Sequence, residues 1–257
     1  MTRQHDRATM FNALHVKGRP VVLFNVWDAG TAMAVARAGA RALATGSWSV
    51  AEAHGFRDGE TLPRELALAN LRRIAGAVDL PVTVDLESGY GGSPDAVAET
   101  VTRAIEAGAI GFNLEDQIIG QTGLYAVAEQ AARVHAARAA VDRTGIPAYV
   151  NARTDLFLKA EPADHDDKLL DAALQRADAY RAVGASGFFA PGLVDDGLIG
   201  RLCAACALPV NILMRPGAPP TQRLAALGVA RVSFGPAPYR LAMRVIEDAA
   251  REALSGT

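Results

Sequence analysis

Short apolar runs recur along the chain, and polar residues and a helical segment follow each of them. The runs have the length of buried strands, and the run at Pro81–Asp85 is rich in β-branched residues. Eight runs fit this description: Val21–Val26, Ala42–Thr45, Pro81–Asp85, Ile110–Leu114, Pro147–Asn151, Gly187–Ala190, Pro209–Leu213 and Arg231–Phe234. Short apolar strands that alternate with helices predict a parallel sheet covered by helices.

The helical segments end in small steps that contain glycine, such as A-G-A at Ala38–Ala40 and Ala107–Ala109. We predict a leading amphipathic helix over Thr2–Val16 and a closing helix over Ala237–Leu254. Eight strand–helix units in a chain of this length indicate an α/β fold, a (β/α)8 TIM-type barrel that forms one domain over residues 1–257. A doubly wound open sheet usually carries a Gly-rich phosphate turn after its first strand, where this chain reads W-D-A-G-T.

Composition and charge narrow the classes of partner. The formal net charge is -2 and Lys and Arg form no run, so no basic field attracts nucleic acid. No apolar stretch approaches the ~20 residues of a membrane-spanning helix, and the first residues do not resemble a signal peptide. We therefore expect a cytoplasmic protein without nucleic-acid or membrane partners. Cys203 and Cys206 lie late in a predicted helix, and we interpret them as small buried hydrophobic residues rather than a redox pair.

Polar residues gather where the predicted strands end. The carboxyl ends of parallel barrel strands meet at one mouth, and the loops there carry function. The longest predicted loops, Ser47–Pro63, Glu115–Ala128 and Asp155–Asp167, all follow strands. The polar residues expected at this mouth are Asp28, Thr45, Ser47, Trp48, Asp85, Glu87, Glu115, Asp116, Asn151, Arg153, Asp155, Asn211 and Arg215.

Two carboxylates mark the end of the third predicted strand. Two residues apart on one strand, Asp85 and Glu87 would point to the same face and repel each other. A hard divalent cation, Mg²⁺ or Mn²⁺, would relieve that repulsion because it binds carboxylate oxygens. A solvated strand end with a flexible turn is the alternative. Arg153 is the cation suited to bind a carboxylate in bidentate fashion, so the pattern favours a Mg²⁺ site beside a small anionic substrate.

Six motifs in this order resemble the isocitrate lyase/phosphoenolpyruvate mutase superfamily. They are N-V-W-D-A-G at Asn25, A-T-G-S-W at Ala44, G-F-R-D-G-E at Gly55, D-L-E-S-G-Y-G at Asp85, N-L-E-D-Q at Asn113 and N-A-R-T-D at Asn151. The resemblance extends from about Phe11 to Tyr239. It implies an α/β barrel whose last helix is often exchanged between subunits, and therefore a homo-oligomer, either a dimer or a tetramer.

The resemblance also implies roles for individual residues. Mg²⁺ would be held mainly by Asp85, with Glu87 and Glu115 acting directly or through water. Asp58 matches the family's aspartate on a mobile loop, and Arg153 matches the arginine that contacts substrate.

The substrate contacts are expected to come from several strand ends. Backbone N–H groups of the turn formed by Gly46, Ser47 and Trp48 would bind a carboxylate or enolate oxygen. The other predicted substrate-binding residues are Trp27, Asp28, Asn211 and Arg215. Arg215 would either clamp a second carboxylate or pair with a neighbouring acid. Tyr90 would either move a proton, as a catalytic residue beside Arg153 and Asp58, or serve only in packing.

Departures from the family motifs bear on the reaction. Lyases of the family carry K-x-C-G-H after the fourth strand, whereas Gln117–Tyr125 reads Q-I-I-G-Q-T-G-L-Y, without Cys, His or Lys. Ala44 stands where some of these lyases have a tyrosine, the loop lysine and asparagine of the mutases are missing, and Glu87 replaces the usual aspartate. What remains is a Mg²⁺-dependent carbon–carbon lyase, of decarboxylase or retro-aldol type, that acts on a small 2-oxo- or 2-hydroxydicarboxylate through an enolate-type intermediate. A phosphonopyruvate-type phosphomutase or hydrolase, and a barrel that binds a 2-oxo acid without turnover, stay open as alternatives.

Overall fold

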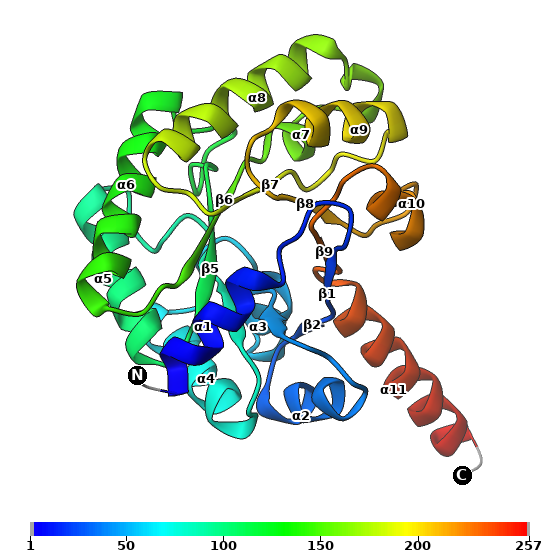
Figure 1. Cartoon of the computed structure of the whole chain (residues 1–257). Coiled ribbons are helices and arrows are strands. Elements are labelled where there is room, and N and C mark those ends of the chain that lie inside the picture. The colour runs from blue at the N-terminus through cyan, green and yellow to red at the C-terminus, as the bar shows by residue number, and fades with distance from the viewer. Residues whose placement is uncertain (1–2, 256–257) are drawn as a thin grey trace.

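The parallel strands close into a barrel (Figure 1). The computed structural model describes residues 3–255. Its strands are β1 Val21–Leu23, β2 Asn25–Val26, β3 Leu43–Thr45, β4 Val82–Asp85, β5 Gly111–Glu115, β6 Tyr149–Arg153, β7 Gly187–Phe189, β8 Val210–Leu213 and β9 Arg231–Ser233. The strand order is β1-β9-β8-β7-β6-β5-β4-β3-β2, with every neighbouring pair parallel. Because only Phe24 separates β1 from β2, these two act as one interrupted strand that joins both ends of the order. The predicted barrel is confirmed.

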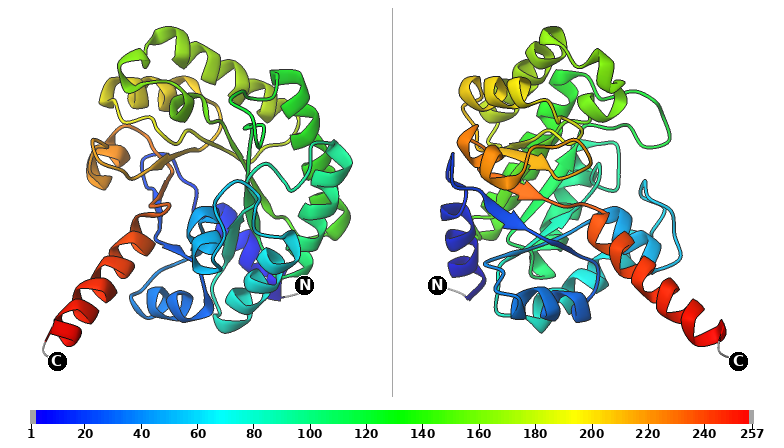
Figure 2. Two further views of the ribbon diagram at one scale, coloured as in Figure 1. Left: turned by 180° about the vertical axis from the view of Figure 1, so that it is seen from behind. Right: turned by 90° about the vertical axis from the view of Figure 1, so that its right-hand side faces the viewer.

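Helices surround the strands on the outside (Figure 2). They are α1 Arg3–Ala13, α2 Ala29–Arg37, α3 Ser47–Ala53, α4 Arg64–Ala77, α5 Pro94–Glu106, α6 Val127–Thr144, α7 Leu156–Lys159, α8 Asp167–Ala182, α9 Asp196–Ala205, α10 Thr221–Ala226 and α11 Ala237–Ser255, with one 3-10 turn, η1, at Pro162–Asp164. Two of the predicted loops are partly helical, which corrects the sequence interpretation. Residues 47–63 begin with α3, and residues 155–167 contain α7 and η1.

Alternation along each strand divides the side chains between two cores. On β5, Phe112 and Leu114 join the apolar core between strands and helices, while Asn113 and Glu115 face the barrel axis. The register then sets neighbours, because Glu115 of β5 lies opposite Arg153 of β6. The polar candidates therefore meet inside the barrel because strand alternation and register bring them there.

The amino-terminal end of the barrel is covered by α1. Its Phe11 is fully buried and packs in one cluster with Ile110 and Tyr149, which lie just before or at the start of strands. Tyr149 also stacks on His15, with ring centroids 3.9 Å apart. This cover leaves the opposite end of the barrel for a ligand.

The closing helix α11 projects away from the barrel (Figures 1 and 2). Among its residues only Pro238 is buried, and Val245 and Ile246 are 59% and 58% exposed. Within residues 3–255, no helix combines the length and the apolar character needed to cross a membrane. Cys203 and Cys206 are buried free thiols, and burial raises the pKa of both.

Candidate active site

A cavity of about 590 Å³ opens at the carboxyl end of the strands. Seven of the predicted site residues line it: Gly46, Ser47, Trp48, Asp58, Asp85, Arg153 and Arg215. They come from α3 and its N-cap directly after β3, from β4 and β6, and from the loops after α3 and β8. Residues far apart in the sequence therefore share one cavity, as the strand-end argument predicts.

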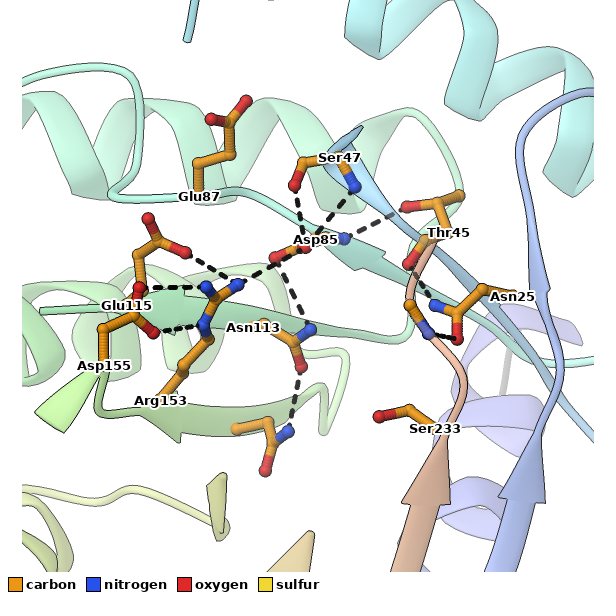
Figure 3. A network of polar contacts seen from close by, with 12 residues as sticks. Asn25, Thr45, Ser47, Asp85, Glu87, Asn113, Glu115, Arg153, Asp155 and Ser233 are labelled. Carbon is orange, nitrogen blue, oxygen red and sulfur yellow. Dashed lines mark hydrogen bonds and ion pairs between the residues drawn. The ribbon is translucent and has the colours of Figure 1, made fainter. Parts of the chain in front are cut away.

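Arg153 is surrounded by acids (Figure 3). Its Nε and Nη2 donate to the two carboxylate oxygens of Asp155 at 2.6 and 3.0 Å. Its Nη1 lies 2.8 Å from Glu115 Oε2 and 3.8 Å from Asp85 Oδ2. Burial alone would lower the pKa of Arg153, but the charges of Asp155, Glu115 and Asp85 hold it well above its ordinary value. Arg153 is thus a fixed cation, and Asp155 orients it.

Asp85 is oriented from both sides at the end of β4. Its Oδ2 accepts from Ser47 Oγ at 3.0 Å and from Ser47 N at 3.4 Å, and its Oδ1 accepts from Asn113 Nδ2 at 3.5 Å (Figure 3). Its backbone N–H donates to Thr45 Oγ1 at 3.1 Å. The carboxylate therefore has a defined orientation before any ligand arrives.

Glu87 does not share a strand face with Asp85, so that expectation was wrong. β4 ends at Asp85, and Glu87 has a positive φ of 52° that turns the chain away from the strand direction. Its Oε2 accepts from the backbone N–H groups of Gly59 and Glu60 at 2.8 and 2.7 Å. In return, Glu60 Oε1 accepts from Tyr90 N at 2.8 Å. Glu87 therefore ties the loop after β4 to the loop that carries Asp58.

Several of these carboxyl groups hold protons more strongly than usual. Burial and the charges of Asp58 and Asp85 raise the pKa of Glu87 to about 8. Burial raises the pKa of Glu115, although Arg153 opposes the shift. Burial and Asp85 also raise the pKa of Asp58. The site holds more negative charge than Arg153 compensates.

Three predicted substrate-binding residues do not line the cavity, and the structure shows each of them in other contacts. Asp28 caps α2 instead, since its Oδ1 accepts from Thr31 N at 2.7 Å. Trp27 packs edge-on against Tyr239, with ring centroids 5.1 Å apart. Asn211 is buried and donates to main-chain oxygens within the barrel.

Tyr90 lies beside the cavity rather than in its wall. It lines a small neighbouring space of about 20 Å³ together with Ser47 and Asp85. Burial and the charges of Glu87 and Glu60 raise the pKa of its phenol, so Tyr90 stays protonated at neutral pH.

Sequence reasoning missed several cavity residues, among them Asn25 and two arginines of α11. Asn25 Oδ1 accepts from the N–H groups of Phe234 and Gly235 at 2.8 Å, which fixes the rim beside the last strand. Its place at the start of N-V-W-D-A-G was a signal that could have identified it. Arg240 and Arg244 of α11 also line the cavity. Their spacing of four residues put them on one helix face, but nothing in the sequence placed that face at the cavity.

The carboxylates fit Mg²⁺ in one coordination mode. Within residues 3–255, no cluster of three or more His, Cys, Asp or Glu residues has the spacing of a metal cage. Mg²⁺ does not require such a cage, because it usually keeps several waters and binds one or two carboxylates. The set of hard oxygen donors around Asp85, with raised pKa values at Glu87 and Glu115, suits a hydrated divalent cation. Asp85 would be the direct ligand, and the two glutamates would act through water.

The phosphoenolpyruvate phosphomutase family model matches residues 11–254. The chain belongs to this family. It is 34% identical over 246 residues to an uncharacterised protein of Mycobacterium tuberculosis, covering 96% of this chain and 89% of that one. It is 32% identical over 212 residues to 2-methylisocitrate lyase of Escherichia coli, covering 80% of this chain and 69% of the lyase. A solved structure from Burkholderia cenocepacia, provisionally described as a phosphonomutase, is 52% identical with a TM-score of 0.95, covering 97% of this chain and 99% of that one.

More distant structures share the fold alone. Phosphonopyruvate hydrolase, solved with oxalate and Mg²⁺, is 22% identical with a TM-score of 0.85 and covers 100% of this chain and 89% of its own. The family as a whole includes lyases, decarboxylases, hydrolases and mutases. Membership therefore places the chain in a superfamily of enzymes. It does not identify the reaction, which has to be inferred from the site residues.

Proposed function

We propose that the chain is a Mg²⁺-dependent carbon–carbon lyase that acts on a small 2-oxo- or 2-hydroxydicarboxylate through an enolate-type intermediate. The observation that carries the proposal is the cavity itself, in which Arg153 and the Asp85 carboxylate stand side by side. A dicarboxylate of this class offers an anionic end to the arginine and oxygens to a cation beside Asp85. Relatives support the cofactor, since members of the superfamily bind Mg²⁺.

Individual residues would bind the substrate, stabilise the developing charge and transfer the proton. Arg153, oriented by Asp155, would bind a substrate oxygen and stabilise the negative charge that develops as the carbon–carbon bond breaks. Backbone N–H groups at Gly46–Trp48 would hold a carboxylate oxygen. When bound, Mg²⁺ would supply Lewis-acid stabilisation of the enolate charge. Asp58 lines the cavity and has a raised pKa, so it would deliver the proton that the product carbon takes up.

Three further cations support a substrate with a second anionic group. Arg215, Arg240 and Arg244 all line the cavity and are exposed, and none forms an ion pair with an acid within residues 3–255. The Arg240 guanidinium lies 4.5 Å from the centroid of the Trp48 ring, which holds it at the rim. The loop after β5, where the family's lyases carry K-x-C-G-H, contributes no side chain between residues 116 and 128 to the cavity wall.

A phosphonopyruvate-type mutase or hydrolase is the second candidate. The 52% identity with a provisional phosphonomutase favours it. The three rim arginines would also suit a phosphono group, which arginine binds well.

A substrate panel tests the proposal. Purified protein with Mg²⁺ would be given oxaloacetate, 2-methylisocitrate, 2,3-dimethylmalate or phosphonopyruvate, and the release of pyruvate and of inorganic phosphate would be followed separately. Pyruvate from one of the first three without phosphate is the expected result. Phosphate or phosphoenolpyruvate formed from phosphonopyruvate would favour the second candidate, and binding without any product would favour a silent barrel.

Asp85→Ala should abolish turnover of whichever substrate is active. The variant removes the proposed direct Mg²⁺ ligand, so we expect a loss of at least about 1,000-fold in kcat/KM together with loss of Mn²⁺ binding. Asp95→Ala, on the outer helix α5, is the matched control and should retain full activity. Normal turnover by Asp85→Ala would contradict the assignment of the metal site.

A further inference from the structure

A guanidinium lies buried inside the barrel on the amino-terminal side of the cavity. Arg231 begins β9, lies opposite Asn211 of β8 and is 1% exposed. Its Nη2 donates to Asn113 Oδ1 at 3.2 Å, whereas its Nε and Nη1 have no hydrogen-bond partner in the described chain. No carboxylate of residues 3–255 lies within the 4.0 Å of an ion pair. Burial lowers the pKa of Arg231 to about 10, so it remains charged at neutral pH. An unpaired buried charge is costly, and stability alone does not account for it.

Three asparagines connect this arginine to the site. Asn151 Nδ2 donates to Asn113 Oδ1 at 2.9 Å and to Asn211 Oδ1 at 3.2 Å, and Asn211 Nδ2 donates to the main-chain oxygen of Arg231 at 3.2 Å. Asn113 completes the path, because its Nδ2 donates to Asp85 Oδ1 at 3.5 Å (Figure 3). The path thus runs from β9 through β5 to the proposed metal ligand at the end of β4.

Arg231 determines which group donates and which accepts at Asn113. A guanidinium has donors only, so the Asn113 atom that faces it must be the acceptor Oδ1. The NH2 group of Asn113 must then face Asp85. Asn151 also donates to Oδ1, but an amide can turn over and present its oxygen instead. Arg231 and the ionised Asp85 carboxylate stand at the two ends of the path, and neither can reverse its role, because the first only donates and the second only accepts.

We propose that Arg231 is a positioning residue of the active site, which acts through Asn113 to fix the Asp85 carboxylate toward the cavity. This inference rests on the proposed function, in which Asp85 binds the cation. The two possible effects of losing Arg231 change cation binding in opposite directions. Loss of a nearby positive charge would by Coulomb's law alone tighten cation binding. Loss of the fixed donor lets Asp85 turn, and cation binding weakens.

Mn²⁺ binding without substrate is the readout, measured from the electron paramagnetic resonance signal of the free ion. In the full chain, Arg231→Met should weaken Mn²⁺ binding ~10-fold, the lower end of the usual effect of a residue behind a metal ligand. Arg231→Lys keeps a donor-only group and should recover most of the affinity. Asn113→Ala should weaken binding to the same degree as Arg231→Met. Adding Arg231→Met to Asn113→Ala should cause no further weakening, because both changes remove the same path.

Each other outcome overturns the proposal. Unchanged or tighter Mn²⁺ binding by a folded Arg231→Met protein would show that the arginine acts by charge or by packing only. Additive losses in the double variant would mean that Arg231 does not act through Asn113. Should Arg231→Met fail to fold by circular dichroism, unchanged affinity of Asn113→Ala would be sufficient to reject the path. Asp85→Ala separates the two proposals: if this variant still binds Mn²⁺, the metal assignment itself fails.

Discussion

At the scale of single residues, the site concentrates negative charge around one arginine. Asp85, Glu115 and Asp155 surround Arg153, with Asp58 and Glu87 close to Asp85, and burial together with repulsion between these acids raises the pKa of Asp58, Glu87 and Glu115. A buried carboxyl group with a raised pKa gains protons on folding, which couples stability to pH. The pattern also favours a divalent cation, since its charge offsets the excess.

Glu87 should make the metal-free protein less stable at alkaline pH. Its pKa rises to about 8 from an ordinary value of 4.5. The stabilisation is therefore complete below about pH 4.5 and is lost as pH rises through 8. With chelator present, the free energy of unfolding in urea should fall between pH 5 and pH 8.5, with a contribution from Glu87 on the order of a few kcal/mol.

Glu87→Gln cannot ionise, so its unfolding free energy should depend less on pH over this range. Glu106→Gln, on the exposed surface of α5, is the control and should behave like the parent chain. An identical pH dependence for Glu87→Gln and the parent would mean that this carboxyl group does not titrate as described.

At the scale of elements, the sequence predicts the positions of the strands better than it predicts the roles of individual side chains. All eight apolar runs form strands, because a strand buried between the barrel interior and the helices requires apolar residues. Glu87 and Asp28 show the limit. β4 ends at Asp85 as predicted, but the positive φ at Glu87 turns its side chain off the strand face, and the D-A-G-T segment forms a helix cap at Asp28. Such local backbone choices depend on tertiary contacts, here the N–H groups of Gly59 and Glu60.

Asp28→Ala tests the capping assignment. Removal of the cap should lower the free energy of unfolding by about 1 kcal/mol, because Thr31 N loses its acceptor. KM for the active substrate should stay unchanged, since Asp28 does not line the cavity. Ser93→Ala, which removes the cap of α5, provides the comparison and should show a similar loss of stability. An increase in KM for Asp28→Ala alone would return Asp28 to the substrate-binding residues.

At the scale of the whole molecule, α11 is the element that the barrel does not account for. Its first turns bring Arg240 and Arg244 to the cavity, while the rest projects away (Figure 2). Leu241 and Val245 lie four residues apart on one side and are 49% and 59% exposed, and Ile246 beside them is 58% exposed. A contiguous apolar helix face in water favours a partner surface. A second copy of this chain, which carries the same helix, is the occupant we expect, and the family resemblance implies the same arrangement.

Charges on this face should therefore separate the subunits. We expect the parent chain to elute as a dimer or tetramer in size-exclusion chromatography with light scattering, and Val245→Glu combined with Ile246→Glu to shift it toward monomer, because burying two unpaired carboxylates is unfavourable. Glu247→Lys lies on the opposite, polar side of α11 and should leave the mass unchanged. Because α11 carries Arg240 and Arg244, loss of the oligomer should also raise KM for an anionic substrate. A monomeric parent chain would refute the predicted assembly, and an oligomer that survives both glutamates would mean that the subunits meet elsewhere.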